Sequence, residues 1–429
     1  MKALILAGGI GKRLSPITET IPKAMIPLVG KPLLEHIIES LKANNIKDIY
    51  LVVGYMANKI QDYFGNGYKF DVNITYIHQP SPTGVADAIL RAEDIIDASR
   101  FLLLNSDVTI TRELVQRVLE VDSRLHPESL IAATLVTNPQ FYGIVEVDAD
   151  SRITKIIEKP STETTHSHYA VAGLYLLNRE IFESLKKYQA LDKAIQHKIN
   201  TTEGIYAVVW EKDWAEITWP WDILVANKLI LRSFFKDQKG IFIAENANVS
   251  ENANIEGPVY IGDNVTVRSG AQIVGPAYIG GNSYIGNNSL VRENTSINKN
   301  VKVGFGVEIK NSVVFNDAFI GRLSYVGDSI ISENTMIGAG TQTWNLTADE
   351  KIYYTTVEGE RIEVPLKKFG TVIGPGSDLG INVSIYPGVR IGARTIIDAG
   401  AIIKDCVPSD SHVRVIQQQK IQKRDLPEK

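Results

Sequence analysis

The hydrophobic positions of the first 235 residues alternate between two kinds of pattern. Short apolar runs bounded by turn residues predict buried strands. These runs are Leu4–Leu6, Ile49–Val53, Ile74–Ile77, Phe101–Leu104, Leu130–Leu135 and Gly173–Leu177. Segments with a helical period lie between the first of them. The clearest is Lys31–Ala43, where Pro32 suits the first turn and the aliphatic residues share one face. This alternation predicts an α/β domain with a mostly parallel, Rossmann-like mixed sheet over residues 1–235.

A different period begins near residue 240. From Ile243 to Ile309 an aliphatic residue occupies every sixth position without a miss, and after a phase slip the period resumes from Ile373 to Ile403. A helix with a 3.6-residue period cannot keep such a repeat on one face. A coil whose flat sides are each six residues long can, because one aliphatic side chain then points inward from each side. The pattern predicts a parallel β-helix of hexapeptide repeats over residues 240–408.

Two segments depart from this repeat. Residues 340–370 are polar and contain Trp344, Tyr353 and Tyr354. We expect them to leave the coil as an insertion shaped like a hairpin arm, either a functional loop or an inert one. Residues 409–429 form a polar C-terminal tail, in which the pattern favours a short helix over Val413–Arg424.

Composition narrows the classes of function. A chain of 429 residues is long enough for about two to three domains. Its net charge of -4 argues against a nucleic-acid partner. The single cysteine, Cys406, excludes a disulfide framework and a cysteine-based zinc site, and suits a reducing compartment. The first apolar run is broken by glycine, and no run approaches the ~20 residues that cross a bilayer. We therefore expect a cytoplasmic protein without a membrane partner.

The start of the chain carries the clearest chemical signal. Gly8-Gly9-Ile10-Gly11 follows the first predicted strand, and loops with so few side chains let backbone N–H groups point at an anion. Three cations follow, namely Lys12, Arg13 and Lys23. The simplest alternative is an ordinary strand–turn–helix with solvated cations. The combination of a buried strand, a bare loop and three cations favours a polyphosphate site.

Two aspartates are candidate metal ligands. Asp107 follows a buried strand and Asp222 precedes a helical pattern. Each has an alternative role as a helix N-cap, before the helices expected at Thr111–Val121 and Ile223–Leu231. Convergence of both carboxylates on Mg²⁺ beside a triphosphate would decide for the metal role.

Two loops add candidate binding residues. Gln79 offers a donor and an acceptor that suit the edge of a pyrimidine ring, and Gly84 allows close backbone approach. The alternative is a turn before a helix at Val85–Ala92. Glu158-Lys159-Pro160 follows a predicted strand, where an exposed surface turn is the alternative to a binding role.

These motifs together resemble the sugar-1-phosphate nucleotidylyltransferases, also called NDP-sugar pyrophosphorylases. The matching elements, in chain order, are Leu6–Leu14, Pro22-Lys23, Gln79 with Gly84, Asp107, Tyr142-Gly143, Glu158-Lys159-Pro160, Ala172–Tyr175 and Asp222. The two-part architecture is similar to the archaeal bifunctional type, in which a left-handed β-helix with acetyltransferase activity follows the nucleotidyltransferase domain.

The resemblance implies the reaction of a nucleoside triphosphate with a sugar 1-phosphate, which yields an NDP-sugar and pyrophosphate. It implies Mg²⁺ as the cofactor, held by Asp107 and Asp222, and a catalytic role for Arg13 and Lys23. The implied nucleotide-binding residues are Leu6, Ala7, Gly8, Gly9, Gly11, Gln79 and Gly84. The implied sugar-phosphate-binding residues are Gly143, Glu158, Lys159 and Gly173. The loop around Gln79 resembles that of pyrimidine users, so we expect UTP or dTTP with glucose 1-phosphate or N-acetylglucosamine 1-phosphate.

The second domain resembles the acetyltransferase less closely. Glu308, Lys310, Tyr325 and Asn345 match the family, but Arg322 stands where the family has its catalytic histidine. Arginine stays protonated and cannot act as a general base, and the sequence has no histidine between His197 and His412. Three alternatives follow: a bifunctional enzyme that also binds acetyl-CoA, a coil that only builds or regulates an oligomer, and a regulatory subunit that senses NDP-sugar. The resemblance implies a homotrimer or a multiple of it. Retention of the catalytic cations and aspartates argues against a regulatory subunit.

Overall fold

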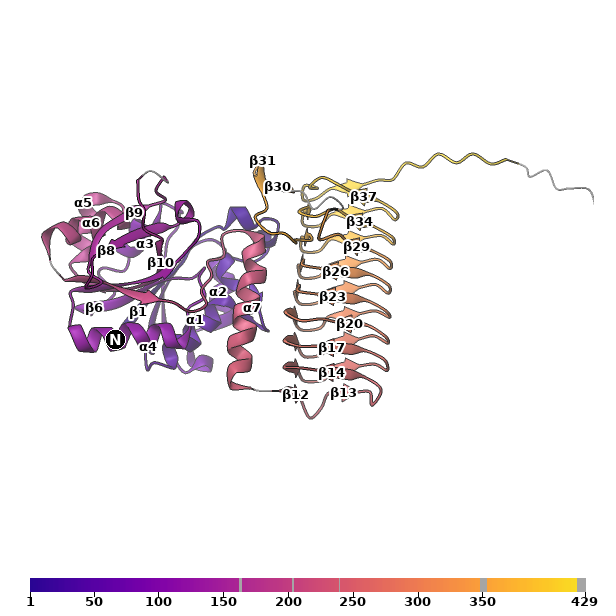
Figure 1. The fold of residues 1–429 in the computed structure, drawn as a ribbon, viewed down its shortest axis with the longest axis horizontal. Coiled ribbons are helices and arrows are strands. Elements are labelled where there is room, and N and C mark those ends of the chain that lie inside the picture. Colours follow the sequence, from indigo (N-terminus) through magenta and orange to yellow (C-terminus); the bar gives the residue numbers. More distant parts are fainter. Residues whose placement is uncertain (162–163, 203, 239, 348–352, 423–429) are drawn as a thin grey trace, which may run out of the picture.

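The computed structural model describes residues 1–161, 164–202, 204–238, 240–347 and 353–422. Within them, an α/β domain stands beside a tall coil of short parallel strands, and helix α7 (Pro220–Asp237) runs along the side of the domain that faces the coil (Figure 1). This arrangement confirms both predicted parts of the fold, the mixed Rossmann-like sheet and the left-handed β-helix.

The α/β domain is built on a mixed sheet with the strand order β11-β7-β10-β6-β1-β4-β5. Strand β1 is parallel to β4 and β6, whereas β10 is antiparallel to β6 and β7. The strands are β1 (Lys2–Ala7), β4 (Asp48–Val53), β5 (Asn73–His78), β6 (Arg100–Asn105), β7 (Ser129–Leu135), β10 (Tyr169–Asn178) and β11 (Ile205–Trp210). Strand β8 (Gly143–Val147) pairs with both β10 and β9 (Ile153–Glu158), so this hairpin extends the sheet beside β10. The predicted apolar runs all lie in these strands.

Helices cover both faces of this sheet because successive residues of a strand point to opposite sides. Ala3 and Ile5 of β1 belong to one core with α1, α2 and α4, whereas Leu4 belongs to a second core with α3, α5 and α6. The helices are α1 (Leu33–Lys42), α2 (Ala57–Phe64), α3 (Val85–Leu90), α4 (Arg112–Leu125), α5 (Ile181–Tyr188) and α6 (Leu191–Thr201). Single 3₁₀ turns are η1 (Lys12–Leu14), η2 (Ile17–Glu19), η3 (Lys23–Met25), η4 (Tyr68–Phe70) and η5 (Pro139–Phe141), and β2 (Pro27–Leu28) pairs with β3 (Lys31–Pro32).

The coil consists of three parallel sheets whose strands follow one another along the chain. The sheet toward α7 contains β12 (Ile241–Ile243), β15 (Val259–Ile261), β18 (Ala277–Ile279), β21 (Thr295–Ile297), β24 (Val313–Val314), β27 (Ile330–Ile331), β32 (Val372–Ile373) and β35 (Arg390–Ile391). The second contains β13 (Asn248–Val249), β16 (Thr266–Val267), β19 (Tyr284–Ile285), β22 (Lys302–Val303), β25 (Phe319–Ile320), β28 (Met336–Ile337), β33 (Asp378–Leu379), β36 (Ile396–Ile397) and β38 (His412–Val413). The third contains β14 (Asn254–Glu256), β17 (Gln272–Val274), β20 (Leu290–Val291), β23 (Glu308–Lys310), β26 (Tyr325–Gly327), β29 (Gln342–Thr343), β34 (Ser384–Ile385) and β37 (Ile402–Ile403).

The repeat and its phase slip both have a structural cause. Ile279 pairs with Ile261 on the turn before it and with Ile297 on the turn after it, and all three are fully buried along the axis of the coil. Ile297 then pairs with Val314, one residue earlier than an unbroken repeat would place it. The turns that follow are therefore one residue shorter, and the aliphatic positions keep their inward direction although the sequence period shifts.

The insertion forms the expected hairpin, β30 (Tyr354–Val357) and β31 (Glu360–Glu363). It projects from the coil toward the α/β domain (Figure 1). Its flanking residues Tyr353, Val364 and Phe369 share a hydrophobic core with Leu14 and Trp221 of the first domain. The insertion is thus part of the contact between the two domains.

Lower on the coil, three outward aromatic rings, Phe242, Tyr260 and Tyr278, stack on one another with centroids 4.9 Å apart. Phe234 of α7 meets the ring of Tyr260 edge-on. Gly30 lies against this column with φ at +81°, and a Cβ there would stand 2.1 Å from the Tyr278 hydroxyl. Only glycine fits this close approach of the two domains.

Two local predictions need correction. Residues 414–422 form no helix, and the last two residues of the predicted Val413–Arg424 helix lie outside the described residues. Ile416 and Ile421 are each 92% exposed, so this segment lacks the tertiary packing that stabilises most helices. Helix α7 extends beyond the predicted Ile223–Leu231 at both ends. No helix among the described residues combines the length and apolarity needed to cross a bilayer.

Candidate active site

The glycine loop lies at the carboxyl end of β1, in the middle of the sheet. Gly11 adopts φ at +69°, which favours glycine, and its carbonyl accepts the Leu14 N–H at 2.9 Å in η1. Leu14 is fully buried, whereas Lys12 and Arg13 are exposed. Burial of Leu14 anchors the short 3₁₀ turn, so the two cations are held on the surface beside the loop.

Gln79 reaches this loop from the end of β5. Its Nε2 donates to the Gly84 carbonyl at 3.0 Å and to Asp87 at 2.9 Å. Its Oε1 faces Gly8 so closely that a Cβ on that glycine would lie 3.0 Å away. The structure therefore brings together three residues that the sequence predicts as nucleotide-binding.

Asp87 is a residue that sequence reasoning missed here. Hydrogen bonds from Arg91, Thr83 and Gln79 lower the pKa of the Asp87 carboxyl to about 2. A carboxylate that stays ionised fixes the orientation of the Gln79 amide. In the sequence, the i,i+4 spacing of Asp87 and Arg91 indicated an ion pair on a helix, but it did not indicate a contact with Gln79.

Asp107 and Lys23 form an ion pair next to the glycine loop. The Ser106 hydroxyl donates to the Leu6 carbonyl at 2.7 Å and so joins the end of β6 to the end of β1. Lys23 on η3 points back toward this junction, with its Nζ 2.5 Å from Asp107 Oδ2. The N-cap alternative for Asp107 is wrong, because Thr111 caps α4 and accepts the Leu114 N–H at 3.2 Å.

Glu216 is a second carboxylate at this place that sequence reasoning missed. The chain after β11 pairs with the loop after β6, through a bridge between Val108 and Glu216 and a hydrogen bond from the Ile217 N–H to the Asp107 carbonyl at 2.8 Å. Burial is the larger cause and the nearby charge of Asp107 the second of a rise in the pKa of Glu216 to about 7. Its signal in the sequence is a lone charge between the apolar Ala215 and Ile217, a pattern typical of a strand with one polar face.

Asp222 is the third residue of α7 and accepts main-chain hydrogen bonds at the start of this helix, whose N-cap is Trp219. Its Oδ2 accepts the N–H groups of Thr218 and Trp219 at 2.9 and 2.7 Å, which caps the first turn of α7 from inside the helix. Burial raises its pKa to about 6, against the opposing effects of those hydrogen bonds and of Lys23. The charge of Asp222 contributes to the raised pKa of Glu216, and the charge of Lys23 opposes the rise in the pKa of Asp222. Asp222 therefore belongs to the same group of interacting charges as Asp107.

These residues suit a divalent cation by their chemistry. Asp107, Glu216 and Asp222 supply hard oxygen donors with Lys23 among them, and their charges raise the pKa of Glu216 beyond the effect of burial. Such repulsion is what a bound cation would relieve. Within the described ranges, no group of three His, Cys, Asp or Glu side chains is already drawn together as a metal site.

Three of the predicted sugar-phosphate residues lie on β8, β9 and β10, and Lys159 follows directly after β9. Gly143 is opposite Glu158 in the β8–β9 pair, and a Cβ on it would meet Glu158 Oε2 at 3.0 Å. Lys159 has φ at +44°, and its Nζ lies 3.4 Å from Glu158 Oε1 in an exposed pair. Gly173, with φ at +72°, sits where the register of β10 shifts and where a Cβ would crowd Val108. Both glycines thus make room for neighbouring side chains of the site.

Tyr175 lies between Glu158, a predicted sugar-phosphate residue, and the carboxylates of Asp107 and Glu216. It is buried, and burial raises its pKa, with further increases from the charges of Glu158, Glu216 and Asp107. One side chain therefore lies near carboxylates of both halves. The glycine loop and Asp107 lie at the carboxyl ends of β1 and β6, where open α/β sheets bind ligands.

A separate polar cluster lies on the coil around Asp328, which is 4% exposed. Asn311 and Asn345 donate to its two oxygens at 2.6 and 2.5 Å, and Lys310 Nζ lies 3.9 Å away. Asn345 also donates to the Tyr325 hydroxyl at 3.2 Å, and Tyr325 is opposite Glu308 in register. Arg322 is exposed at the preceding corner, and no hydrogen bond joins it to the cluster in the described part of the chain.

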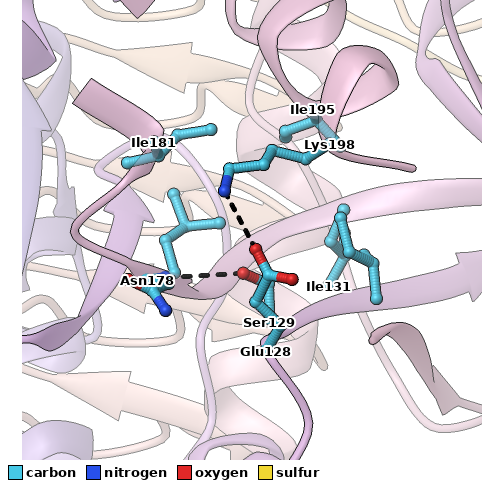
Figure 2. A pocket seen from close by; sticks show the side chains of 9 residues that line it. Glu128, Ser129, Ile131, Asn178, Ile181, Ile195 and Lys198 are labelled. Atoms are coloured by element: carbon cyan, nitrogen blue, oxygen red, sulfur yellow. Dashed lines mark hydrogen bonds and ion pairs between the residues drawn. The ribbon is translucent and has the colours of Figure 1, made fainter. Parts of the chain in front are cut away.

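Two pockets away from the glycine loop are lined by none of the predicted site residues. A cavity of about 10 Å³ is lined by Glu128, Ser129 and Lys198, whose Nζ lies 3.1 Å from Glu128 (Figure 2). Figure 2 shows isoleucines closing its other sides, so it has room for a single water at most. A groove of about 810 Å³ lies among α1, α4 and α7. The candidate site therefore lies outside both of these pockets.

Comparisons with known proteins identify the family of the chain. Residues 2–232 match the family described as "Nucleotidyl transferase", and residues 273–369 match the "GMPPB C-terminal domain". The chain belongs to the nucleotidyl transferase family.

Its relatives share the whole two-domain organisation. The chain is 35% identical to the "Bifunctional protein GlmU" of Methanococcus maripaludis, over 96% of its own length and 97% of the relative. It is 37% identical to the "Bifunctional sugar-1-phosphate nucleotidylyltransferase/acetyltransferase" of Sulfurisphaera tokodaii, over 94% of its own length and 97% of the relative.

Proposed function

We propose that this protein synthesises NDP-sugars by transferring a nucleotidyl group from a pyrimidine nucleoside triphosphate to a sugar 1-phosphate. The observation that carries the proposal is the Lys23–Asp107 pair, which joins the glycine loop to the carboxylates Glu216 and Asp222 at the carboxyl ends of β1 and β6. An oxygen of the sugar phosphate attacks the α-phosphorus in line. The bond from that phosphorus to the bridging oxygen breaks, and pyrophosphate leaves.

The protein contributes charge and position rather than covalent chemistry. The glycine loop and Arg13 bind the triphosphate, and Lys23 neutralises charge on the reacting phosphate. Glu158 and the Gly143 backbone bind sugar hydroxyls, while Lys159 binds the sugar phosphate. The positions of Gly143 on β8, of Glu158 at the end of β9 and of Lys159 directly after it support a sugar site on the far side of Tyr175 from the glycine loop.

Mg²⁺ is the proposed cofactor, with Asp107 and Asp222 as its protein ligands and Glu216 beside them. When bound, the cation withdraws negative charge from the α-phosphate. Lys23 donates to a single oxygen of Asp107, so its ammonium group keeps further donors for a phosphate oxygen.

UTP or dTTP is the proposed nucleotide and glucose 1-phosphate or N-acetylglucosamine 1-phosphate the proposed acceptor. With Nε2 of Gln79 engaged by Gly84 and Asp87, its Oε1 offers a fixed acceptor beside the loop. The imide N–H of uracil or thymine is a donor that this acceptor fits.

A second candidate activity is acetyl transfer on the coil, with acetyl-CoA as a further substrate. The cluster of Glu308, Lys310, Tyr325 and Asn345 around Asp328 favours it, as do the names of the relatives. Against it stands Arg322, since a guanidinium cannot take a proton from the attacking amine. Incubation with acetyl-CoA and glucosamine 1-phosphate tests it, and absence of free-thiol release would exclude it.

We further propose that the protein is a cytoplasmic homotrimer or a multiple of one. On the second sheet of the coil, four apolar side chains point outward from one column of paired strands, with exposed fractions of 38–51%: Tyr284, Phe319, Met336 and Ile396. The exposed charged residues Lys302 and Asp378 stand between them in the same column. A second copy of the coil would cover the apolar positions of this column. Sedimentation equilibrium tests the mass, and a monomer at micromolar concentration would refute it.

A matrix of nucleotides against sugar 1-phosphates, read by pyrophosphate release, tests the main proposal. We expect turnover with UTP or dTTP and little with ATP or GTP. Binding of NDP-sugar without turnover of any pair would instead favour a regulatory protein.

A further inference from the structure

An arginine of the coil reaches the 3₁₀ turn that follows the glycine loop of the other domain. Arg390 on β35 is 5% exposed, and its Nη1 donates to the main-chain carbonyls of Arg13 and Ser15, both at 2.9 Å. These carbonyls lie at the end of η1, the 3₁₀ turn that presents Lys12 and Arg13. The guanidinium therefore satisfies carbonyl groups that a helix end leaves without intrahelical partners.

The rest of the guanidinium is only partly satisfied. Nε donates to Thr355 on the insertion hairpin at 3.1 Å, while Nη2 has no hydrogen-bond partner within the described ranges. Burial lowers the pKa of Arg390 to about 10, so the group remains charged at neutral pH. Burying a charge with incomplete bonding is costly, and a hydrophobic side chain would fill the space more cheaply. A hydrophobic side chain at position 390 could not donate hydrogen bonds to the carbonyls of Arg13 and Ser15, as the guanidinium of Arg390 does.

The segment after η1 is also fixed on the coil. Glu19 accepts the Ser409 hydroxyl at 2.7 Å and lies 3.4 Å from Arg394 Nη2. The Thr20 hydroxyl donates to Glu333 at 2.5 Å. Residues 13–20, which connect the glycine loop to Lys23, therefore contact the second domain along their length.

Arg13 itself faces the candidate site. Its guanidinium carbon lies 5.1 Å from the centroid of the Trp219 ring, and the Trp219 N–H donates to Asp222. The main chain of residue 13 is held by Arg390, and its side chain is held over Trp219. Both constraints are needed to aim one flexible cation at a triphosphate.

We propose that Arg390 is a positioning residue for nucleotidyl transfer, acting through the carbonyls of Arg13 and Ser15 to hold the phosphate-binding cations in place. This inference rests on the proposed function of the first domain. It makes the coil a part of the nucleotidyltransferase site, whatever chemistry the coil has of its own.

The test compares Arg390→Met with Arg268→Met, which removes an exposed arginine from the turn after β16 of the same coil. Both variants are assayed as full-length protein at a temperature where circular dichroism shows them folded. For Arg390→Met we expect a fall in kcat/KM for the nucleotide of about 10- to 100-fold, since small displacements of reacting groups have effects of that size. KM for the sugar phosphate should stay within about twofold of the wild-type value. Arg390→Lys should regain part of the loss.

A purely structural role predicts a different result. Activity would then fall only in proportion to the unfolded fraction, with KM for the nucleotide unchanged, and that outcome would overturn the proposal. Wild-type kinetics in Arg390→Met would overturn it as well.

A second readout does not depend on activity. Hydrogen exchange of a peptide covering residues 9–22 should accelerate in Arg390→Met and not in Arg268→Met. If the wild type is inactive with every substrate pair, the proposed function fails and the positioning role with it, while exchange still tests separately whether Arg390 holds residues 13–15 in place. Unchanged exchange in this peptide would refute the positioning role.

Discussion

Replacing Lys23 with methionine removes the ammonium group that lies among the carboxylates of the candidate site. In the structure its Nζ is 2.5 Å from Asp107, and its charge lowers the pKa values of Glu216 and Asp222. Methionine keeps the unbranched stem of the side chain as far as Cε and lacks the terminal ammonium group with its charge and hydrogen bonds. The variant therefore isolates the electrostatic role that we assign to Lys23.

The expected loss of activity follows from the position of this cation. Removing one preorganised donor to a developing charge typically costs ~10²–10³ in kcat, or about 3–4 kcal/mol. Lys23 is also proposed to offset the carboxylates beside Mg²⁺, so we expect a loss at the upper end of this range or beyond. The loss of stability should be smaller, about 1–3 kcal/mol, because the pair contributes a charged hydrogen bond that is still partly exposed.

The assay is pyrophosphate release under saturating substrates, with the folded fraction checked by thermal melting. The matched control is Lys47→Met, which removes a lysine paired with Asp71 at 2.8 Å on the exposed surface of the same domain. We expect the control to retain wild-type kcat. A Lys23→Met variant with kcat within about threefold of the wild type would refute this account of phosphate stabilisation.

Three further variants test other parts of the structure. Asp107→Asn should lower turnover by ~10²-fold or more and raise the Mg²⁺ concentration needed, because a charged ligand is lost, and unchanged Mg²⁺ titrations would argue against the ligand role. Gly8→Val should raise KM for the nucleotide, since its Cβ would stand 3.0 Å from Gln79 Oε1, and a normal KM would exclude close packing there. Ile297→Ala empties a fully buried position of the coil and should cost about 2–5 kcal/mol in chemical denaturation, whereas a change below ~1 kcal/mol would contradict the tight stacking.

The coil could be predicted from sequence because its physical rule is local. Each flat side buries one aliphatic side chain, so the period of the sequence is the period of the structure, and the slip after Ile309 is a shortened turn. The glycine loop could also be predicted from sequence, because its glycines meet local requirements. Gly8 allows the close approach of Gln79, and Gly11 adopts a positive φ.

What sequence reasoning missed depends on contacts between distant segments. Glu216 joins Asp107 only because the chain after β11 returns to the loop after β6. Arg390 is one of many arginines in the sequence, and its contact with the carbonyls of Arg13 and Ser15 exists only after the two domains dock. The helix predicted near Val413 failed for a related reason, because a helical pattern without a surface to pack against does not suffice.

We propose that the glycine loop with its neighbouring carboxylates binds the nucleoside triphosphate, that the residues around Glu158 bind the sugar 1-phosphate, and that a nucleotidyl group passes between these two substrates. The most direct measurement is pyrophosphate release by the wild-type protein with each nucleoside triphosphate and each sugar 1-phosphate in the presence of Mg²⁺. The account predicts release with UTP or dTTP together with glucose 1-phosphate or N-acetylglucosamine 1-phosphate, and none without the sugar phosphate. Absence of release with every pair would contradict it.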